Sequence, residues 1–394
     1  MAPDLRIPTD LLPSDGRFGS GPSKIRPEQV AALSAAGSSL LGTSHRQKPV
    51  RALVGHIKAG LTSLLGLPDG YEIVLGAGGS SAFWDVATCC LVEHRSAHGV
   101  FGEFGAKFAA ATTRAPFLAE PSVTQSEPGT VVLPRPVEDA DVYAWPHNET
   151  STGVMAPVRR DPRYGDALVV VDATSAAGAL PVDLTQADVY YFAPQKVLAS
   201  DGGLWLAAVS PAAIERAARI EASGRWVPEF LSFSAAVTNS RQDQTLNTPA
   251  ITTLVLLAEQ LDWIAAHGGL PWAIERSATS AGHLYSWAQA RDWATPFVAD
   301  EAARSTVVGT VDLLPPVEAA TVTSVLRANG VVDTEPYRRL GRNQLRVGMY
   351  PAVDPDDVLA LTACVGRQPA VRRRRTRMRI TTRRAPRRSP PSAT

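Results

Sequence analysis

Short apolar runs alternate with helical patterns over the first two thirds of the chain. Apolar runs of strand length occur at residues 71–75, 142–145, 167–171, 189–192 and 204–209. Apolar positions at helical spacing predict helices that begin near Glu28 and that cover residues 50–65, 82–92 and 251–266. Because strands that alternate with helices form parallel sheets covered on both faces, we expect an α/β fold with a largely parallel sheet.

The pattern changes after the turn His267-Gly268-Gly269. The residues beyond it predict two helices and two strands, at 272–290, 317–329, 307–311 and 344–349. These elements suit a compact α+β unit with its own small sheet, so we place a domain boundary near Gly268. We expect an N-terminal extension, a large domain, a small C-terminal domain and a tail, at residues 1–15, 16–267, 268–365 and 366–394.

The tail differs from the rest of the chain in charge. Eleven arginines and no acidic residue follow Val365, and because the whole chain has a net charge of +1, the remainder carries about −10. With so few apolar residues the tail is expected to be disordered. It could bind nucleic acid or another anionic surface, or it could be an extension without function. We favour the extension, since no aromatic residues lie between the arginines to stack on bases.

Composition argues against a membrane-spanning protein. No segment approaches the roughly 18 uncharged apolar residues that cross a bilayer, and Asp4, Arg6 and Asp10 stand where a signal peptide needs its apolar core. We therefore expect a cytoplasmic protein. The chain has three cysteines, Cys89, Cys90 and Cys364. Their spacing matches no metal site, so we expect small buried side chains and no bound metal.

A lysine and an aspartate follow two of the predicted strands. Asp172 comes directly after residues 167–171, and Lys196 follows residues 189–192. Parallel strands meet at one edge of a sheet, where α/β enzymes place their chemistry. Pyridoxal phosphate requires a lysine that can form a Schiff base and an aspartate that pairs with its ring nitrogen. Alone, Asp172 could be a helix cap and Lys196 a surface residue; together they favour this cofactor.

A glycine-rich turn lies between the strand at 71–75 and the following helix. It reads Gly76-Ala77-Gly78-Gly79-Ser80-Ser81, and glycines in such a turn let the backbone and the helix N-terminus approach a phosphate. A dinucleotide-binding turn would look similar, but the spacing and the ribose-binding acid are missing. A tight turn without any ligand is the other alternative. Gly79 and Ser80 are the predicted phosphate contacts.

Five short motifs in a fixed order resemble the phosphoserine aminotransferase family, class V pyridoxal-phosphate enzymes, in the form typical of actinobacteria. They lie at residues 18–22, 43–46, 147–153, 193–196 and 247–249. The resemblance implies fold type I, with a large domain built on a mostly parallel seven-stranded sheet and a smaller C-terminal α+β domain. It also implies amino transfer between phosphoserine with 2-oxoglutarate and 3-phosphohydroxypyruvate with glutamate, in serine biosynthesis.

The resemblance assigns a role to each cofactor-binding position. Lys196 would hold the cofactor covalently and Asp172 would pair with its ring nitrogen. Phe104 matches the aromatic residue that stacks on the ring, and Thr150 would lie near the ring hydroxyl. The remaining implied contacts are with the phosphate, from Gly79, Ser80 and Gln195 and, across a homodimer interface, from Asn247 and Thr248 of the neighbouring subunit.

The substrate carries two anionic groups, which arginine can bind bidentately. The resemblance assigns Arg346 to the α-carboxylate and His45 and Arg46 to the phosphate side. A further phosphate contact is expected at Tyr337-Arg338-Arg339, where the family's Gly-His-Arg is absent, and we choose Arg339 over Arg338. Without the family pattern, His45 and Arg46 could be surface turn residues, and Arg346 could be paired with an acid on its own sheet.

Other functions stay open at this point. A 4-phosphohydroxythreonine transaminase would share the same motifs. A cysteine desulfurase would need a reactive cysteine on a loop, whereas Cys89 and Cys90 fall in an apolar helix and Cys364 lies near the C-terminal end. A nucleic-acid-binding protein on an inactive scaffold would not need Lys196 and Asp172, so nucleic acid is not an expected partner.

Overall fold

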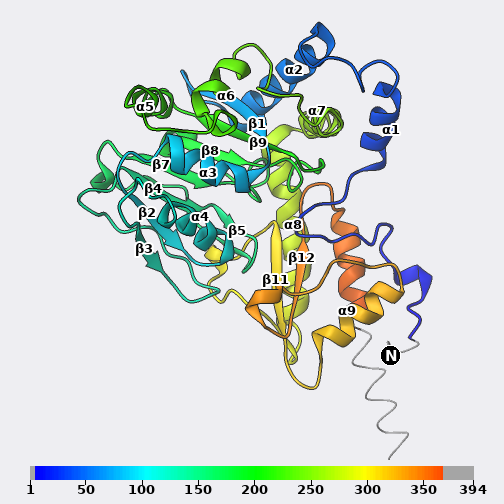
Figure 1. Ribbon diagram of the computed structural model, residues 1–394. Helices are drawn as coiled ribbons and strands as arrows, with labels where there is room; N and C mark the ends of the chain where they lie inside the picture. Colours follow the sequence, from blue (N-terminus) through cyan, green and yellow to red (C-terminus); the bar gives the residue numbers. More distant parts are fainter. Residues whose placement is uncertain (1–4, 367–394) are drawn as a thin grey trace, which may run out of the picture.

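The computed structural model describes residues 5–366, and its centre is a seven-stranded sheet (Figure 1). The strand order is β1-β9-β8-β7-β4-β2-β3, and every neighbouring pair is parallel except the two that include β9. This confirms the predicted fold class. The strands are β1 (Glu72–Ala77), β2 (Ser96–Val100), β3 (Ser122–Gln125), β4 (Val142–Pro146), β7 (Leu168–Asp172), β8 (Val189–Phe192) and β9 (Leu204–Val209).

Helices cover both faces of this sheet. Strand β7 shows why, because its residues alternate between two cores: Val169 and Val171 belong to one core, and Val170 belongs to the other. Helices α2 and α7 contribute to the first core, and α3, α4, α5 and α6 to the second. The helices of this part are α1 (Pro27–Ala36), α2 (Lys48–Leu65), α3 (Ser80–Cys90), α4 (Glu103–Thr113), α5 (Pro211–Ala222), α6 (Phe233–Ser240) and α7 (Ile251–Ala266).

The C-terminal part has its own three-stranded antiparallel sheet and its own core. In Figure 1 its orange and red elements lie below and to the right of the large sheet. Within residues 5–366, no helix combines the length and the apolar character needed to cross a bilayer. The elements are α8 (Gly269–Gln289), β10 (Ala294–Pro296), β11 (Val308–Leu313), α9 (Ala319–Ala328), β12 (Gln344–Gly348) and a helix over 355–366.

The first described residues pack against this C-terminal part. Ile7 and Phe18 belong to its core, and the backbone of Phe18 hydrogen-bonds to Val332 at 3.3 Å and to Gly348 at 2.8 Å. Figure 1 shows the dark blue N-terminal segment near α9. The domain limits from the sequence stay predictions, and the predicted tail lies outside the described residues except for Gly366.

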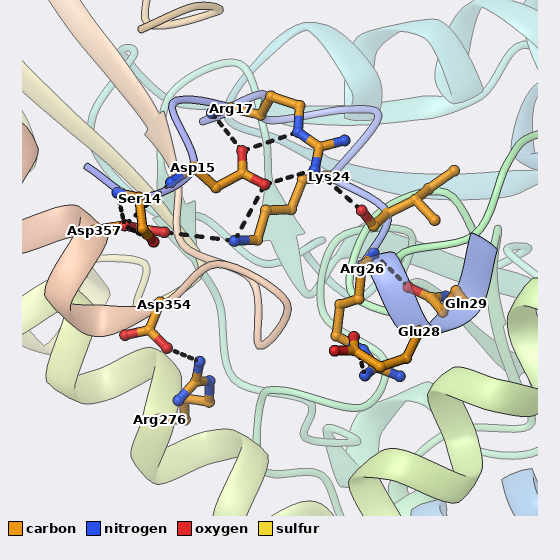
Figure 2. Close-up of polar contacts among 11 residues, drawn as sticks. Ser14, Asp15, Arg17, Lys24, Arg26, Glu28, Gln29, Arg276, Asp354 and Asp357 are labelled. Carbon is orange, nitrogen blue, oxygen red and sulfur yellow. Dashed lines mark hydrogen bonds and ion pairs between the residues drawn. The ribbon is translucent and has the colours of Figure 1, made fainter. Parts of the chain in front are cut away.

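Polar contacts tie the segment before α1 into a loop (Figure 2). Ser14 donates from its backbone N–H and its hydroxyl to Asp357 Oδ1, both at 2.7 Å. The Lys24 amine lies 3.7 Å from Asp15 and 3.5 Å from Asp357. These contacts join the two ends of the loop to the C-terminal helix, and residues 20–22 between them line the cavity of the candidate site.

Candidate active site

A cavity of about 390 Å³ lies where the parallel strands of the large sheet end. The loops after β1, β4, β7 and β8 reach it from the sheet, and β12 reaches it from the C-terminal part. A volume of this size suits a small organic ligand. Eight of the predicted residues line it, namely Gly79, Ser80, Phe104, Thr150, Asp172, Gln195, Lys196 and Arg346.

Lys196 is the buried amine of this cavity. Its Nζ donates a hydrogen bond to Thr150 Oγ1 at 2.7 Å and lies 4.9 Å from the centroid of the Phe104 ring. Burial lowers the pKa of Lys196 to about 8, although Asp172 and Glu149 act in the opposite direction. A pKa near 8 leaves a useful fraction of the amine unprotonated at neutral pH, which is the nucleophilic form.

The Lys196 amine is held by a chain of hydroxyl groups. Thr150 Oγ1, its acceptor, lies 2.9 Å from Ser175 Oγ, and Ser175 Oγ is 3.0 Å from the backbone oxygen of Asn148. Asn148 donates from Nδ2 back to Ser175 at 2.9 Å. All of these side chains are buried, so the amine has a defined position before any ligand is present.

Asp172 ends β7 inside the same cavity. Its Oδ1 accepts from the Thr174 backbone N–H at 2.9 Å and from the Thr174 hydroxyl at 2.5 Å. The hydroxyls of Thr174 and Ser80 are 2.7 Å apart, which links the aspartate to the glycine-rich turn. The two bonds from Thr174 fix the orientation of the Asp172 carboxylate.

The glycine-rich turn has the backbone that a phosphate site needs. Gly78 and Gly79 have φ angles of 113° and 81°, a region that favours glycine. Helix α3 begins at Ser80, and no side chain caps it. Backbone N–H groups at such a helix start can bind a phosphate. Gln195 Oε1 is buried without a hydrogen-bond partner among the described residues. Pyridoxal phosphate fits this combination of groups, because the cavity offers an amine, a carboxylate, an aromatic face and a phosphate-type helix end together.

Arg346 brings a positive charge into the cavity from β12. Its Nη1 donates to the Thr150 backbone oxygen at 3.3 Å, and its Cζ lies 5.3 Å from the Tyr337 ring centroid. Its Nε is buried without a partner, and no carboxylate within residues 5–366 lies within ion-pair distance of it. The guanidinium therefore has capacity to bind a carboxylate from a ligand.

Five predicted residues do not line the cavity. His45 Nδ1 lies 3.1 Å from Thr248 Oγ1, and Arg46 donates from Nη1 to Gln244 at 3.3 Å, so these segments lie together. Asn247 adjoins Thr248 in the same loop. Arg339, in the short helix η6 (Arg338–Leu340), is ion-paired with Glu103 at 2.5 Å, and its side chain is 72% exposed. No role of these five residues follows from this single chain.

Sequence reasoning missed several cavity residues. Tyr337 and Trp84 line it, and Trp84 donates from Nε1 to the Tyr191 hydroxyl at 2.9 Å. Gly21 also lines it, and a Cβ on Gly21 would lie 2.9 Å from Lys196 Cε. Gly21 and Asn148 lie inside motifs already noted in the sequence, so their place could have been anticipated. Nothing in the local pattern distinguishes Trp84 from a core tryptophan.

A model of the family described as Aminotransferase class-V matches residues 21–358. This chain belongs to the class-V aminotransferases. A protein of Mycolicibacterium vanbaalenii is 63% identical over 365 residues, which cover 93% of this chain and 98% of that protein. Phosphoserine aminotransferase of Rhodococcus opacus is 57% identical over 361 residues, which cover 91% and 96%. The enzyme is thus a pyridoxal-phosphate-dependent aminotransferase.

Solved structures agree with this fold. A phosphoserine aminotransferase from Cytophaga hutchinsonii has a TM-score of 0.83 at 22% identity, with 90% of this chain and 99% of that chain covered. A pyridoxal phosphate-bound phosphoserine aminotransferase from Trichomonas vaginalis has a TM-score of 0.76 at 17% identity, with 89% and 99% covered. At such low identity these likenesses describe the fold, which is fold type I.

The desulfurase alternative is not favoured by the position of the cysteines. None of Cys89, Cys90 and Cys364 lines the cavity. Burial raises the pKa of Cys90 to about 11, which keeps it as an unreactive thiol at neutral pH. Cys90 and Cys364 are buried core residues, as the sequence predicted, whereas Cys89 is only partly buried against the same core as Cys90.

Proposed function

We propose that this aminotransferase acts on phosphoserine and 2-oxoglutarate, with the reverse reaction on 3-phosphohydroxypyruvate and glutamate, as a step of serine biosynthesis. One observation carries the proposal: the cavity that holds the Lys196 amine also holds the Arg346 guanidinium, which no described carboxylate neutralises. An amino-acid substrate carries its α-carboxylate close to its α-amine, so a substrate whose amine takes the place of the Lys196 amine would bring its carboxylate toward the guanidinium. The name of the Rhodococcus opacus relative supports the phosphorylated side chain.

Pyridoxal phosphate, when bound, supplies an electron sink for the bonds at the substrate's α-carbon. Lys196 would hold it covalently, Asp172 would keep its ring nitrogen protonated, and Phe104 would cover one ring face. Thr150 would lie near the ring hydroxyl. The expected phosphate contacts are Gly79, Ser80 and Gln195.

Lys196 has a second task once the substrate has displaced it. Its amine would take the proton that leaves the substrate's α-carbon and pass it to the cofactor's C4′ carbon, and in the other half-reaction it would carry a proton in the opposite direction, acting as general base and then general acid each time. The pKa near 8 suits both directions, because neither form of the amine is rare at neutral pH. The hydrogen bond to Thr150 would hold the amine beside the reacting carbon.

The second anion site would come from the other subunit of a homodimer. Asn247 and Thr248 are expected to reach the phosphate of the neighbouring cofactor, and the contact between Thr248 and His45 brings His45 and Arg46 to the same place. We therefore infer that His45 and Arg46 serve the neighbouring active site too, where they would bind the substrate's phosphate or the side-chain carboxylate of glutamate. Arg339 would contribute only after leaving Glu103.

The remaining expectations concern the cellular location of the protein, its partners and its choice between two substrates. A cytoplasmic location is proposed from the sequence, and small molecules are the expected partners. The 4-phosphohydroxythreonine alternative would place a similar phosphate and carboxylate in the same two sites, and the relatives' name favours phosphoserine. Direct competition between the two substrates in one assay separates them.

A spectroscopic half-reaction tests the activity. The purified protein should be yellow, and excess phosphoserine without any keto acid should bleach it at a rate set by the first half-reaction. Serine, which lacks the phosphate, is the matched control and should bleach it far more slowly. Equal rates for phosphoserine and serine would contradict a phosphate site and leave a general aminotransferase.

Mixed dimers test whether the site is shared. Lys196→Ala and Arg46→Ala subunits are each expected to be poorly active alone. Mixed and allowed to exchange, they should regain activity, because a dimer with one subunit of each kind contains one intact lysine beside an intact neighbouring arginine. If Arg46 served its own subunit, no mixed dimer could contain an intact site and the mixture would stay inactive.

A further inference from the structure

A carboxylate that has no assigned role lies behind the cavity wall. Glu149, in the hairpin strand β5 (Asn148–Glu149) that pairs with β6 (Val154–Met155), is 0% exposed. No lysine, arginine or histidine among residues 5–366 forms an ion pair with it. A buried carboxylate without a cation is costly unless several donors satisfy it, so its partners deserve an explanation.

The partners of Glu149 are all hydrogen-bond donors. Its Oε2 accepts from the backbone N–H groups of Phe104 and Gly105, at 3.0 and 3.1 Å. Its Oε1 accepts from Ser151, through the backbone N–H at 3.0 Å and the hydroxyl at 2.6 Å. Burial raises the pKa of Glu149, and the bonds from Ser151 and Gly105 oppose that rise by favouring the charged form.

These bonds form the cap of α4. The first N–H of the helix, on Glu103, donates to Ser151 Oγ at 3.0 Å, and the next two donate to Glu149. No side chain of α4 itself caps it. A Cβ on Gly102 would lie 2.3 Å from Glu149 Cγ, so only glycine lets the carboxylate come this close. The first turn of α4 is thus held by a segment 45 residues away, and a negative charge there suits the helix dipole.

Phe104 is the second residue of that turn. Its ring lies 4.9 Å from the Lys196 amine, and its backbone N–H is one of the two that bind Glu149 Oε2. The neighbour of Glu149 in the chain, Thr150, accepts the hydrogen bond of Lys196. One short segment therefore sets both the aromatic face and the amine.

We propose that Glu149 is a positioning residue, which holds the Phe104 ring in place for the cofactor by capping α4. The inference rests on the proposed role of Phe104 beside pyridoxal phosphate and does not depend on the identity of the amino-acid substrate. It predicts that loss of the carboxylate acts on cofactor binding through Phe104, in addition to any loss of stability.

Glu149→Gln is the informative substitution. Each oxygen of Glu149 faces at least one backbone N–H, which cannot turn into an acceptor. Whichever way the amide of glutamine is oriented, its NH₂ group meets a donor, and one helix N–H is left unsatisfied or displaced. We expect the affinity of the apoprotein for pyridoxal phosphate to fall about tenfold, as for one lost hydrogen bond to a charged group.

The test is a double-mutant cycle on cofactor affinity. The dissociation constant of pyridoxal phosphate is measured by titration of the apoprotein for wild type, Glu149→Gln, Phe104→Ala and the double variant. If Glu149 acts through Phe104, its substitution should change the constant less than about twofold when the ring is already absent. A tenfold loss in both backgrounds would overturn the proposal. Failure to react with phosphoserine would not affect this titration.

Asp141 provides a control for the loss of stability alone. Like Glu149 it accepts three backbone N–H groups, from Glu93, His94 and Arg95 at 2.9, 2.6 and 2.9 Å. Unlike Glu149 it is also ion-paired, with Arg216 at 3.1 Å, and it precedes β4 at the opposite end of that strand from Glu149. Asp141→Asn should lower the melting temperature without changing the dissociation constant. A similar loss of cofactor affinity in Asp141→Asn would show that the Glu149 effect is only loss of stability, and would overturn the proposal.

A milder variant covers the case in which Glu149→Gln does not fold. Ser151→Ala removes the hydroxyl that accepts from Glu103 and donates to Glu149, and it leaves the two bonds to Oε2. We expect about a threefold loss of cofactor affinity, again absent in the Phe104→Ala background. No change in the wild-type background would count against the proposal.

Discussion

The candidate site has inner residues, which line the cavity, and outer residues, which do not. The two groups differ in whether one chain alone supplies their contacts. The inner residues, of which Lys196, Asp172 and Thr150 are examples, are buried at strand ends and hydrogen-bonded inside the chain. His45 and Thr248 lie outside the cavity, and their side chains contact each other at 3.1 Å. The inner site can therefore take its shape as one chain folds, whereas the outer residues gain a ligand only if another surface meets them, and the proposed second subunit would supply that surface.

The largest effect should come from the inner amine. Lys196→Ala should abolish transamination and the borohydride-reducible attachment of the cofactor while the fold stays intact, because no other described amine lines the cavity. Lys107→Ala is the matched control, since its Nζ lies 5.2 Å from the same Phe104 ring but outside the cavity. Mass spectrometry after borohydride treatment gives the readout. A reducible adduct in Lys196→Ala would show that the lysine is assigned wrongly.

The inner carboxylate should follow. Asp172→Asn should keep the cofactor but lose activity by about two to three orders of magnitude, because a neutral amide cannot hold the ring nitrogen protonated and a charge-assisted bond contributes a few kcal/mol. Steady-state turnover, together with the absorbance of bound cofactor, measures both parts. Near-normal turnover would show that Asp172 has only a structural role, which is to accept the hydrogen bond of the Thr174 N–H.

Two arginines compare the inner and the outer anion site directly. Arg346→Ala should impair phosphoserine and alanine alike, since both carry the α-carboxylate. Arg46→Ala should impair phosphoserine far more than alanine, which has no distal anion. A loss of about 2 to 5 kcal/mol is expected where a bound anion loses its partner. Equal losses for both substrates in both variants would remove the distinction between the two sites.

The pH dependence tests the buried environment of Lys196. With a pKa of about 8, the rate at which the apoprotein binds the cofactor aldehyde should rise about tenfold per pH unit below pH 8 and level off above it. Because the folded pKa of Lys196 lies below the ordinary lysine value of 10.5, the unfolded chain binds more protons between about pH 8 and 10.5, and apoprotein stability should rise with pH there. Stopped-flow absorbance measures the rate, and a midpoint near 10.5 would contradict the burial argument.

The smallest effect on stability is expected for Thr248, and a comparison with Thr174 tests it. Thr248→Val, which removes the contact with His45, should change the free energy of unfolding by no more than about 0.5 kcal/mol, as for an exposed side chain. Its phosphoserine KM should still rise severalfold if the neighbouring site uses it. Thr174→Val, which removes the hydroxyl bound to Asp172, should lower both stability and turnover. A large stability loss in Thr248→Val would place it with the inner residues.

The local sequence pattern was sufficient to predict a strand wherever that strand is a continuous apolar run. Residues 167–171 and 189–192 predicted β7 and β8, so the placement of Asp172 and Lys196 at one sheet edge followed from the sequence. The same reasoning missed β2, whose residues Ser96 to Val100 include a histidine and a glycine in the middle. That strand is buried because β3 and β4 flank it, which no local pattern records.

The sequence by itself determined the fold class, the strand-end lysine and aspartate, and the glycine turn before α3, because each depends on residues that are neighbours in the chain. Only the tertiary structure decided which distant groups meet them. Arg346 reaches the cavity from a different sheet, and Glu149 meets the N-terminus of α4 across 45 residues. Hydrogen bonds and charges act over a few ångströms in space, so their partners are set by how the layers pack and leave no spacing in the sequence.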